Sequence, residues 1–319
     1  MKRMLCVLIA LLLMAVPCLA MAESAQAQPV RVASLKGPTS MGLVKLMKDG
    51  EVSGQYSFTV AGTADEIVPL MAKGELDIAL VPCNLASVLF SKLEGGVAVA
   101  AINTLGVLYI VENGDTVNSV EDLRGQTLYS TGKGTTPEYA LNYVLSENGI
   151  DPATDLTIEY KSESTEVAAA LDAGTVNLAM LPQPYVTTVL TQNPDLRVAL
   201  DLTEEWNAVN PQSALITGVV LLRRPFMEEN PDAVDAFLQD YAASTDYVNA
   251  NPAEASVWIE ELGIAKAAVA EKAIPACNIV CITGEEMREK VSAYLDVLAA
   301  QDPASVGGSV PDDTFYYIG

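Results

Sequence analysis

The chain has 319 residues, with 18 Lys and Arg against 41 Asp and Glu, and a formal net charge of −23. This acidic surplus disfavours nucleic acid and anionic membrane surfaces, so neither is expected as a partner. The absence of histidine excludes Ser-His-Asp and Cys-His catalysis and histidine-based metal sites. We therefore expect no catalytic residue, no metal and no cofactor, with Asp and Glu left as the available acids and bases.

The N-terminal residues 1–22 have the pattern of an export signal. The basic pair Lys2–Arg3 precedes an apolar run, Leu5–Val16, that is too short to cross a bilayer as a helix. Ala20–Ala22 places small residues where signal peptidase reads them, so we predict cleavage before Glu23. The mature protein is therefore expected outside the cytoplasm, in the periplasm or at the cell surface. Its net charge would be −25, because both basic residues of the leader are lost.

The cysteines leave two questions open. Cys18 could carry a lipid anchor, although Pro17 stands where a small flexible residue is preferred. The mature chain retains Cys83, Cys277 and Cys281. The segment between the last two looks strand-like, which would hold their Cα atoms too far apart for a disulfide. Buried free thiols are the favoured interpretation, and a single bridge is the alternative.

Short apolar strands alternate with helices through most of the chain, a pattern that predicts an α/β fold with mostly parallel sheets. The remainder after about residue 223 is predicted to be mainly helical. In chain order the expected elements are strand Val30–Ser34, helix Met41–Lys48, strand Tyr56–Val60, helix Glu66–Lys73, strand Leu76–Val81, helix Leu85–Lys92, a long apolar stretch Val97–Val111 interrupted by Asn103, Thr104 and Gly106, strand Gln126–Thr131, helix Pro137–Ser146, strand Leu156–Tyr160, helix Glu166–Asp172, strand Val176–Leu181, helix Tyr185–Thr191, strand Ala214–Leu222, a helix capped by Asn230–Asp232 that runs to Asn249, and helix Glu285–Ala300.

Three segments of the first half recur in the same order about one hundred residues later. A chain that builds one α/β unit twice usually forms two lobes with a cleft between them. The matching pairs are Leu35–Ser40 with Gly132–Pro137, Glu66–Ile67 with Glu166–Val167, and Gly74–Pro82 with Gly174–Pro182.

The two lobes are expected to be connected by two crossing strands. We predict that residues 23–105 and 217–319 form lobe 1 and that residues 106–216 form lobe 2. The crossings would lie near Leu105–Leu108 and Ile216–Val219, where small residues suit a hinge.

Four turns that follow strands are candidate ligand contacts, because ligands of open parallel sheets bind beyond the carboxyl ends of the strands. Their glycines and helix starts favour an anionic or acceptor-rich ligand, whereas ordinary helix capping and turn formation explain the same residues equally well. Acidic residues nearby (Asp65, Glu138 and Glu166) leave a cationic ligand group as the alternative. The candidates are Lys36, Thr39 and Ser40 in the first turn, Lys133, Thr135 and Thr136 in the second, Asn84 in the third, and Gln183 and Tyr185 in the fourth.

Several segments together cover nearly the whole mature chain in a familiar order. They are Ser119–Leu128 with the Gly132–Pro137 turn, Gly74–Ala79, Asn230–Phe237 and Val248–Glu254. In these segments the chain resembles the extracellular substrate-binding proteins of ATP-driven importers. It is most similar to the branch that binds sulfonates, nitrate, taurine and thiamine pyrimidine precursors.

The resemblance implies a type II periplasmic-binding-protein fold, whose two lobes close around one small molecule and present it to a membrane permease. It also implies contacts from Thr39, Ser40, Asn84, Thr135, Thr136 and Gln183. We expect a monomer that binds a sulfonate, a carboxylate or a pyrimidine-like molecule. An exported sensor is one alternative. An enzyme on the same fold, similar to menaquinone-pathway enzymes, is a weaker one.

Overall fold

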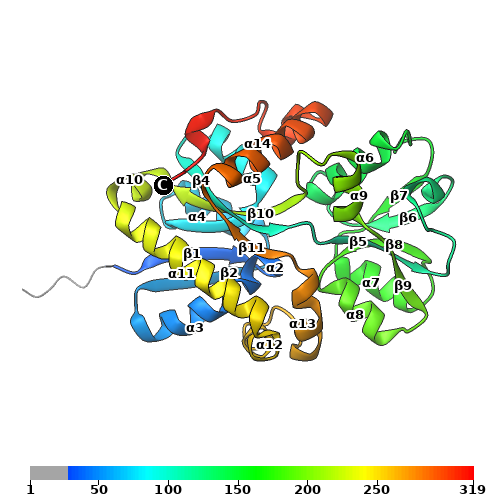
Figure 1. Cartoon of the computed structure of the whole chain (residues 1–319), viewed down its shortest axis with the longest axis horizontal. Coiled ribbons are helices and arrows are strands. Elements are labelled where there is room, and N and C mark those ends of the chain that lie inside the picture. Colours follow the sequence, from blue (N-terminus) through cyan, green and yellow to red (C-terminus); the bar gives the residue numbers. More distant parts are fainter. Residues whose placement is uncertain (1–27) are drawn as a thin grey trace, which may run out of the picture.

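The computed structural model describes residues 28–319 and shows two β-sheets flanked by helices, one in each half of the molecule (Figure 1). The α/β prediction is confirmed. The predicted export signal, residues 1–22, lies outside the described residues. Among the described helices, none combines the length and the apolar composition that crossing a membrane requires.

The first sheet draws its strands from both ends of the chain, and the second from the middle. The strands of the first sheet are β1 (Val30–Leu35), β2 (Tyr56–Ala61), β3 (Ile78–Pro82), β4 (Val97–Leu105), β10 (Ile216–Arg223) and β11 (Ile279–Ile282). Those of the second are β5 (Leu108–Asn113), β6 (Thr127–Ser130), β7 (Thr157–Tyr160), β8 (Leu178–Pro182) and β9 (Leu196–Asp201).

Helices pack on both faces of each sheet (Figure 1). The α-helices are α2 (Pro38–Met41), α3 (Val44–Ser53), α4 (Ala64–Ala72), α5 (Cys83–Lys92), α6 (Thr136–Glu147), α7 (Ser164–Asp172), α8 (Tyr185–Gln192), α9 (Leu202–Val209), α10 (Arg224–Glu229), α11 (Pro231–Ala250), α12 (Pro252–Glu261), α13 (Ala267–Ala273) and α14 (Gly284–Gln301). Short 3₁₀ turns cover Val120–Leu123, Ile274–Ala276, Pro303–Val306 and Asp313–Phe315.

Both sheets are mixed, with most strands running in one direction. The order of the first sheet is β11-β4-β10-β3-β1-β2, and that of the second is β7-β6-β8-β5-β9. β10 is antiparallel to β3 and β4, and β5 is antiparallel to β8 and β9. These are the strands that follow the passage of the chain from one sheet to the other. Each of these two strands enters its sheet at the edge where the parallel strands end, so it is antiparallel to them.

The internal repeat corresponds to repeated structure. β3 and β8 each pair in parallel with the first strand of their repeat and antiparallel with a strand that arrives from the other sheet. The helix before each strand ends at a glycine with positive φ, Gly74 at 72° and Gly174 at 67°. Side chains rarely adopt this backbone conformation, which explains why both copies of the motif begin with glycine.

Three elements interrupt the predicted pattern. The strand β9 and helix α9 complete the second half, and neither was expected from the sequence. β11 lies within the C-terminal part predicted to be mainly helical, and it pairs with β4 at the edge of the first sheet. Short strands of this kind show little alternation of apolar and polar residues in the sequence. Their stability comes from packing against the partner strand.

Aromatic side chains join the two halves along one side. Trp206 of α9 is fully buried, with ring centroids 4.5 Å from Tyr143 of α6 and 5.5 Å from Tyr294 of α14. The hydroxyl of Tyr139 on α6 also lies 3.5 Å from a carboxylate oxygen of Asp302. α14 comes directly after β11 of the first sheet, whereas α6 and α9 belong to the second half. The two halves therefore share a hydrophobic core at this face.

The C-terminal tail is held against the body by its aromatic residues, as the sequence predicts. Phe315 is fully buried, and its ring lies 5.1 Å from that of Phe90. The amide of Tyr317 donates to the carbonyl of Val99 on β4 at 2.8 Å. Cys83, Cys277 and Cys281 are free thiols in the structure.

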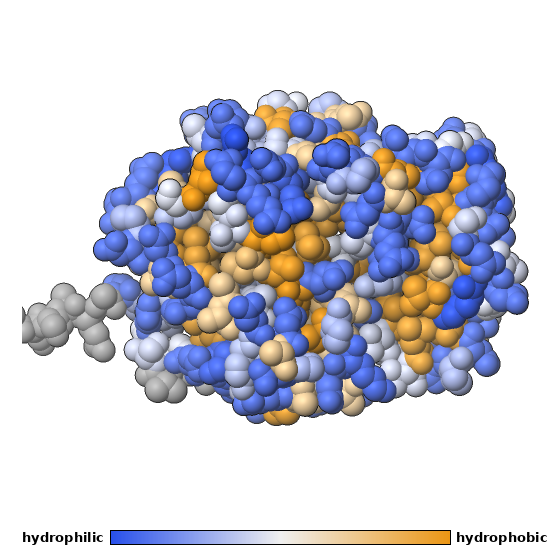
Figure 2. All heavy atoms as spheres, viewed as in Figure 1, coloured by the Kyte–Doolittle hydropathy of each residue, from blue (hydrophilic) through white to orange (hydrophobic). Residues whose placement is uncertain are grey.

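Hydrophilic residues cover the outer parts of one face of the molecule (Figure 2). Figure 2 shows hydrophilic residues over the outer helices of the face in view, with hydrophobic residues gathered toward the middle of the molecule and on parts of the second half. This distribution agrees with the acidic composition of the chain.

A buried carboxylate connects β1, β3 and β10. Asp77 is 5% exposed and accepts hydrogen bonds from Arg31 at 2.6 and 2.8 Å and from Arg223 at 2.9 Å. Burial alone would raise the pKa of Asp77, but the hydrogen bonds from the two arginines outweigh it and lower the pKa.

We expect Asp77→Asn to reduce the free energy of unfolding by about 1–3 kcal/mol at pH 7, because two guanidinium groups lose a charged acceptor. Because the pKa of Asp77 is lowered in the folded state, this stabilisation is fully present above the unfolded pKa of about 4. It is lost progressively as the pH falls from there through the lower folded pKa. Urea unfolding at pH 7 and at pH 3.5 measures both effects. The exposed residue Asp65 provides the control Asp65→Asn. A difference between Asp77→Asn and wild type that is equal at both pH values would contradict the assignment.

Candidate functional site

A cavity of about 670 Å³ lies where the strand ends of the two sheets face each other. Its wall from the first half comes from the turn after β1, the end of β3 and the loop between α12 and α13. Its wall from the second half comes from the turn after β8 and from α8. The residues that line it are Leu35, Lys36, Gly37, Pro38, Thr39, Pro82, Val107, Thr165, Pro182, Gln183, Pro184, Tyr185, Thr188, Gln192, Thr217, Gly263, Ile264, Ala265, Lys266 and Val269.

The charges of this cavity are positive. Lys36 and Lys266 lie at its edge, and no Asp or Glu is among the described residues that line it. Among the described residues, neither ammonium group has an ion-pair partner, and both side chains are exposed. Lys36 reaches toward the α12–α13 loop, since a Cβ placed on Gly263 would lie 4.0 Å from its Nζ. In a chain with a net charge of −23, two unpaired lysines at one cavity favour an anionic ligand group.

Gln183 is the best-placed polar side chain from the second half. It is 4% exposed, and its Oε1 accepts hydrogen bonds from the hydroxyl and amide of Thr187 at 2.8 and 3.3 Å. Its backbone amide donates to the carbonyl of Val107 at 3.0 Å. The side-chain amide nitrogen has no hydrogen-bond partner in the described part of the chain, so it can donate to a ligand.

Tyr185 and Thr39, two of the candidates from the sequence, also line the cavity. Tyr185 is the first residue of α8 and is half-buried. Its burial, and secondarily the nearby negative charge of Glu163, raise the pKa of its phenol. The hydroxyl of Thr39 donates to the carbonyl of Leu35 at 2.7 Å and keeps its acceptor capacity for a ligand.

Ser40 does not reach the cavity. It is fully buried, and its hydroxyl lies 2.5 Å from both the hydroxyl of Ser34 and the carbonyl of Leu35. These contacts close the turn between β1 and α2. Ser40 is not the N-cap of α2, which is Gly37, and its hydroxyl has a structural role within the turn.

Asn84 and Thr136 are brought together, although 52 residues separate them. The hydroxyl of Thr136 lies 3.4 Å from Oδ1 of Asn84, whose Nδ2 is 3.4 Å from the carbonyl of Ser305. Both residues are more than nine-tenths buried. They form a polar contact between the two halves beside the cavity, and neither lines it.

Lys133 and Thr135 lie away from the cavity, on the surface of the second half. The ammonium of Lys133 is 5.9 Å from the ring centre of Tyr160, in a separate hollow beside α6. The hydroxyl of Thr135 donates to the carbonyl of Gly132 at 2.6 Å. Gly132 and Gly134 both have positive φ, a backbone conformation that glycine adopts without a steric cost.

Lys266 and the apolar wall beside it were not expected from the sequence. Lys266 and the Gly263–Ala265 segment connect α12 to α13, and α13 contacts α8 of the second half. The segment has no strand before it, so the rule that ligands bind beyond strand ends could not find it. Val107 and Thr217 sit at the predicted crossings, where the sequence suggested flexibility instead of ligand contact.

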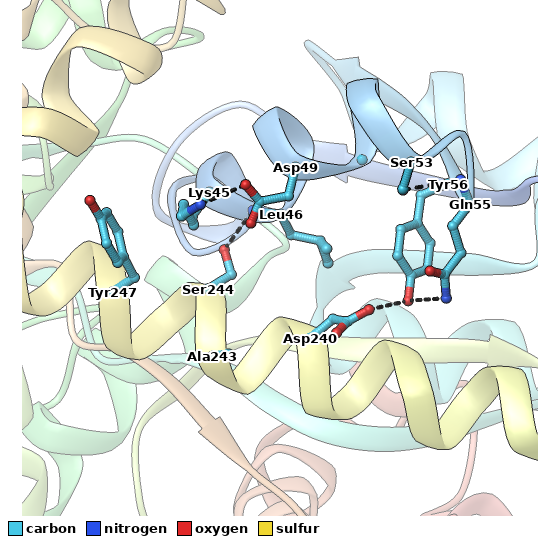
Figure 3. A pocket seen from close by; sticks show the side chains of 11 residues that line it. Lys45, Leu46, Asp49, Ser53, Gln55, Tyr56, Asp240, Ala243, Ser244 and Tyr247 are labelled. Carbon is cyan, nitrogen blue, oxygen red and sulfur yellow. Dashed lines mark hydrogen bonds and ion pairs between the residues drawn. The ribbon is translucent and has the colours of Figure 1, made fainter.

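A second hollow lies on the outside of the first half, between α3 and α11 (Figure 3). Its polar side chains already have hydrogen-bond or ion-pair partners. Lys45 lies 2.5 Å from Asp49, the hydroxyl of Tyr56 donates to Asp240 at 2.7 Å, and the hydroxyl of Ser244 donates to the carbonyl of Gly42 at 2.7 Å. Groups that already have partners have little to offer a ligand. The cavity between the two halves is therefore the candidate site.

Comparison with known proteins agrees with this geometry. Residues 51–273 match the family described as the ABC transporter, phosphonate, periplasmic substrate-binding protein. The chain belongs to this family. It is thus the substrate-binding component of an ABC importer, and membership of the family implies an exported location. A search of curated proteins gives no match.

Solved structures of substrate-binding proteins share the fold over nearly the whole chain. A crystal structure of an ABC transporter from Parabacteroides distasonis has a TM-score of 0.78 at 25% identity, covering 91% of this chain and 99% of that one. The aliphatic sulphonate binding protein SsuA from Escherichia coli has a TM-score of 0.71 at 15% identity, covering 89% and 92%. SsuA from Xanthomonas axonopodis pv. citri, solved with MOPS bound, has a TM-score of 0.68 at 15% identity, covering 92% and 99%. The predicted resemblance and the type II fold are confirmed.

Proposed function

We propose that this importer component captures a small organic anion with an apolar portion in the cavity between its two halves. The observation that carries the proposal is the combination of two unpaired lysines, Lys36 and Lys266, with an apolar wall and no lining carboxylate. An anionic end would lie near the lysines, where a positive potential is uncompensated. The apolar portion would cover Pro82, Val107 and Ile264.

The proposal includes the predicted lobes, residues 23–105 with 217–319 and residues 106–216, which would separate to admit the ligand and close around it. Closure around a ligand changes the surface that a permease reads. A monomer suffices for this mechanism, because both walls of the cavity come from one chain.

We further propose that the bound molecule is released unchanged. The described residues that line the cavity include no Cys, Asp or Glu, and the chain has no histidine. Lysine and tyrosine remain, but neither has the paired acid or base that turnover requires.

Native mass spectrometry of residues 23–319, purified from cells grown on rich medium, tests the proposal. We expect a bound mass that is lost on gentle activation and that corresponds to an organic anion. A thermal-shift screen of alkanesulfonates, arylcarboxylates and inorganic anions follows, with the matching cationic amines as the control set. Stabilisation by inorganic anions or amines, and by no organic anion, would contradict the proposed ligand class.

A further inference from the structure

The two walls of the cavity differ in charge. Both lysines that line it, Lys36 and Lys266, belong to the first half of the molecule. No charged residue is among the described residues that the second half contributes to the wall. The charge that acts on this second wall is negative, since Glu163 lies close enough to Tyr185 to affect its phenol. A ligand in the cavity therefore meets cations on one side and neutral groups on the other.

The side-chain amide of Gln183 is fixed in one orientation. The backbone N–H of Thr187 lies 3.3 Å from one of its two terminal atoms, and because an N–H can only donate, that atom is the oxygen. The hydroxyl of Thr187 donates to the same oxygen at 2.8 Å. Nε2 therefore lies on the other side of the amide. It is not among the polar atoms that the described chain encloses without a partner, so it is open to the cavity that Gln183 lines.

The phenol of Tyr185 is a second neutral donor on this wall. Its hydroxyl has no hydrogen-bond partner in the described residues, and its oxygen is likewise not enclosed by the protein. Burial, and secondarily the charge of Glu163, raise the pKa of the phenol, so it keeps its proton at neutral pH. A protonated phenol can donate a hydrogen bond to a ligand oxygen.

We propose that the second half of the molecule recognises a neutral acceptor group at the far end of the organic anion, and that Gln183 and Tyr185 determine this specificity. The anionic end of the ligand would lie at Lys36 and Lys266. An apolar middle would follow, and a carbonyl or a similar uncharged oxygen would meet the second wall. This inference rests on the proposed function, because it specifies which organic anions the same cavity selects.

Two other kinds of ligand group fit the second wall less well. A second anion would find no cation there to replace its hydration, and the charge of Glu163 would oppose it. An ammonium group would face Nε2 of Gln183, which is itself a donor, while Oε1 is already used by Thr187. A neutral carbonyl accepts from the amide and the phenol without either cost.

Two sets of matched carboxylates test the inference. In each set the carbonyl oxygen is replaced first by a methyl group and then by an ammonium group. The flexible set is 5-oxohexanoate, 5-methylhexanoate and 5-aminohexanoate, and the rigid set is 4-acetylbenzoate, 4-isopropylbenzoate and 4-(1-aminoethyl)benzoate. Calorimetry measures the dissociation constants. We expect wild type to prefer the carbonyl member of at least one set over the other two by about tenfold, the value of one or two hydrogen bonds.

Gln183→Glu separates ligand recognition from a structural role, because a carboxylate still accepts from Thr187 and only the donor is lost. This variant should bind the ammonium member about tenfold more tightly than the carbonyl member, which reverses the wild-type preference. Tyr185→Phe removes only the hydroxyl and should reduce the carbonyl preference to about threefold or less. A merely structural role would lower the affinity for all members and would not exchange one preference for the other.

Gln192→Glu is the matched control. It adds the same charge to the same wall, at the exposed last residue of α8. It should weaken the carbonyl and methyl members equally and keep the wild-type preference. The inference alone is overturned if wild type binds the carbonyl and methyl members of both sets equally tightly, or if Gln183→Glu keeps the carbonyl preference. If wild type binds no member of either set, the proposed function fails as well.

Discussion

Replacing Trp206 with alanine is expected to lower the free energy of unfolding by about 3–5 kcal/mol, the largest loss of stability expected from a single change in this chain. Trp206 is fully buried between Tyr143 and Tyr294. The residue belongs to the second half and Tyr294 to the first, so truncation opens a cavity in a core that both halves share. Urea unfolding followed by circular dichroism measures the loss.

Trp206→Phe is the control for this prediction, because it keeps an aromatic ring and removes the indole nitrogen. In the described residues that nitrogen has no hydrogen-bond partner, so the phenylalanine variant should lose less than about half as much stability. A loss below about 1 kcal/mol for Trp206→Ala would show that the two halves do not share this core.

The second large effect concerns ligand binding. Reversing both charges in Lys36→Glu/Lys266→Glu should weaken binding of an organic anion about 100-fold or more. Each reversal turns an attraction into a repulsion at a partly solvated site, where such an interaction is worth on the order of 1 kcal/mol. Titration with the anion identified by native mass spectrometry measures the change. The wild-type affinity should also fall as salt is added.

The control for the charge reversal is Lys73→Glu/Lys92→Glu. These lysines are exposed and do not line the cavity, and their reversal changes the net charge equally. An equal loss of affinity in both double variants would mean that the charge of the whole molecule acts on the ligand. The proposed role of Lys36 and Lys266 would then be wrong.

The local elements of this fold were largely predictable. The strand at Ile78–Pro82 and its counterpart at Leu178–Pro182 are short apolar runs between helix-ending glycines and prolines, and each signal lies within a few residues. β11 and β9 were harder to predict because their stability comes from β4 and β5, which are distant in the sequence.

The candidate site was predictable only in part. Four of the candidates line the cavity, and their contact with a ligand stays a prediction: Thr39, Gln183, Tyr185 and Lys36. Ser40, Thr135 and Lys133 have the same residue types and similar turns, but they point into the body of the protein or to solvent. A turn motif in the sequence does not specify the direction of its side chains, because that direction depends on the packing of the following helix.

The sequence by itself determined the exported acidic character of this protein, the absence of histidine chemistry, the doubled α/β unit and the family. These properties follow from composition and from patterns that repeat over a few residues. The tertiary structure alone decided that Lys266 joins Lys36 at one cavity, and that Asn103 lies in the space left by Gly218. Both results depend on contacts between residues more than one hundred positions apart, which no local pattern encodes.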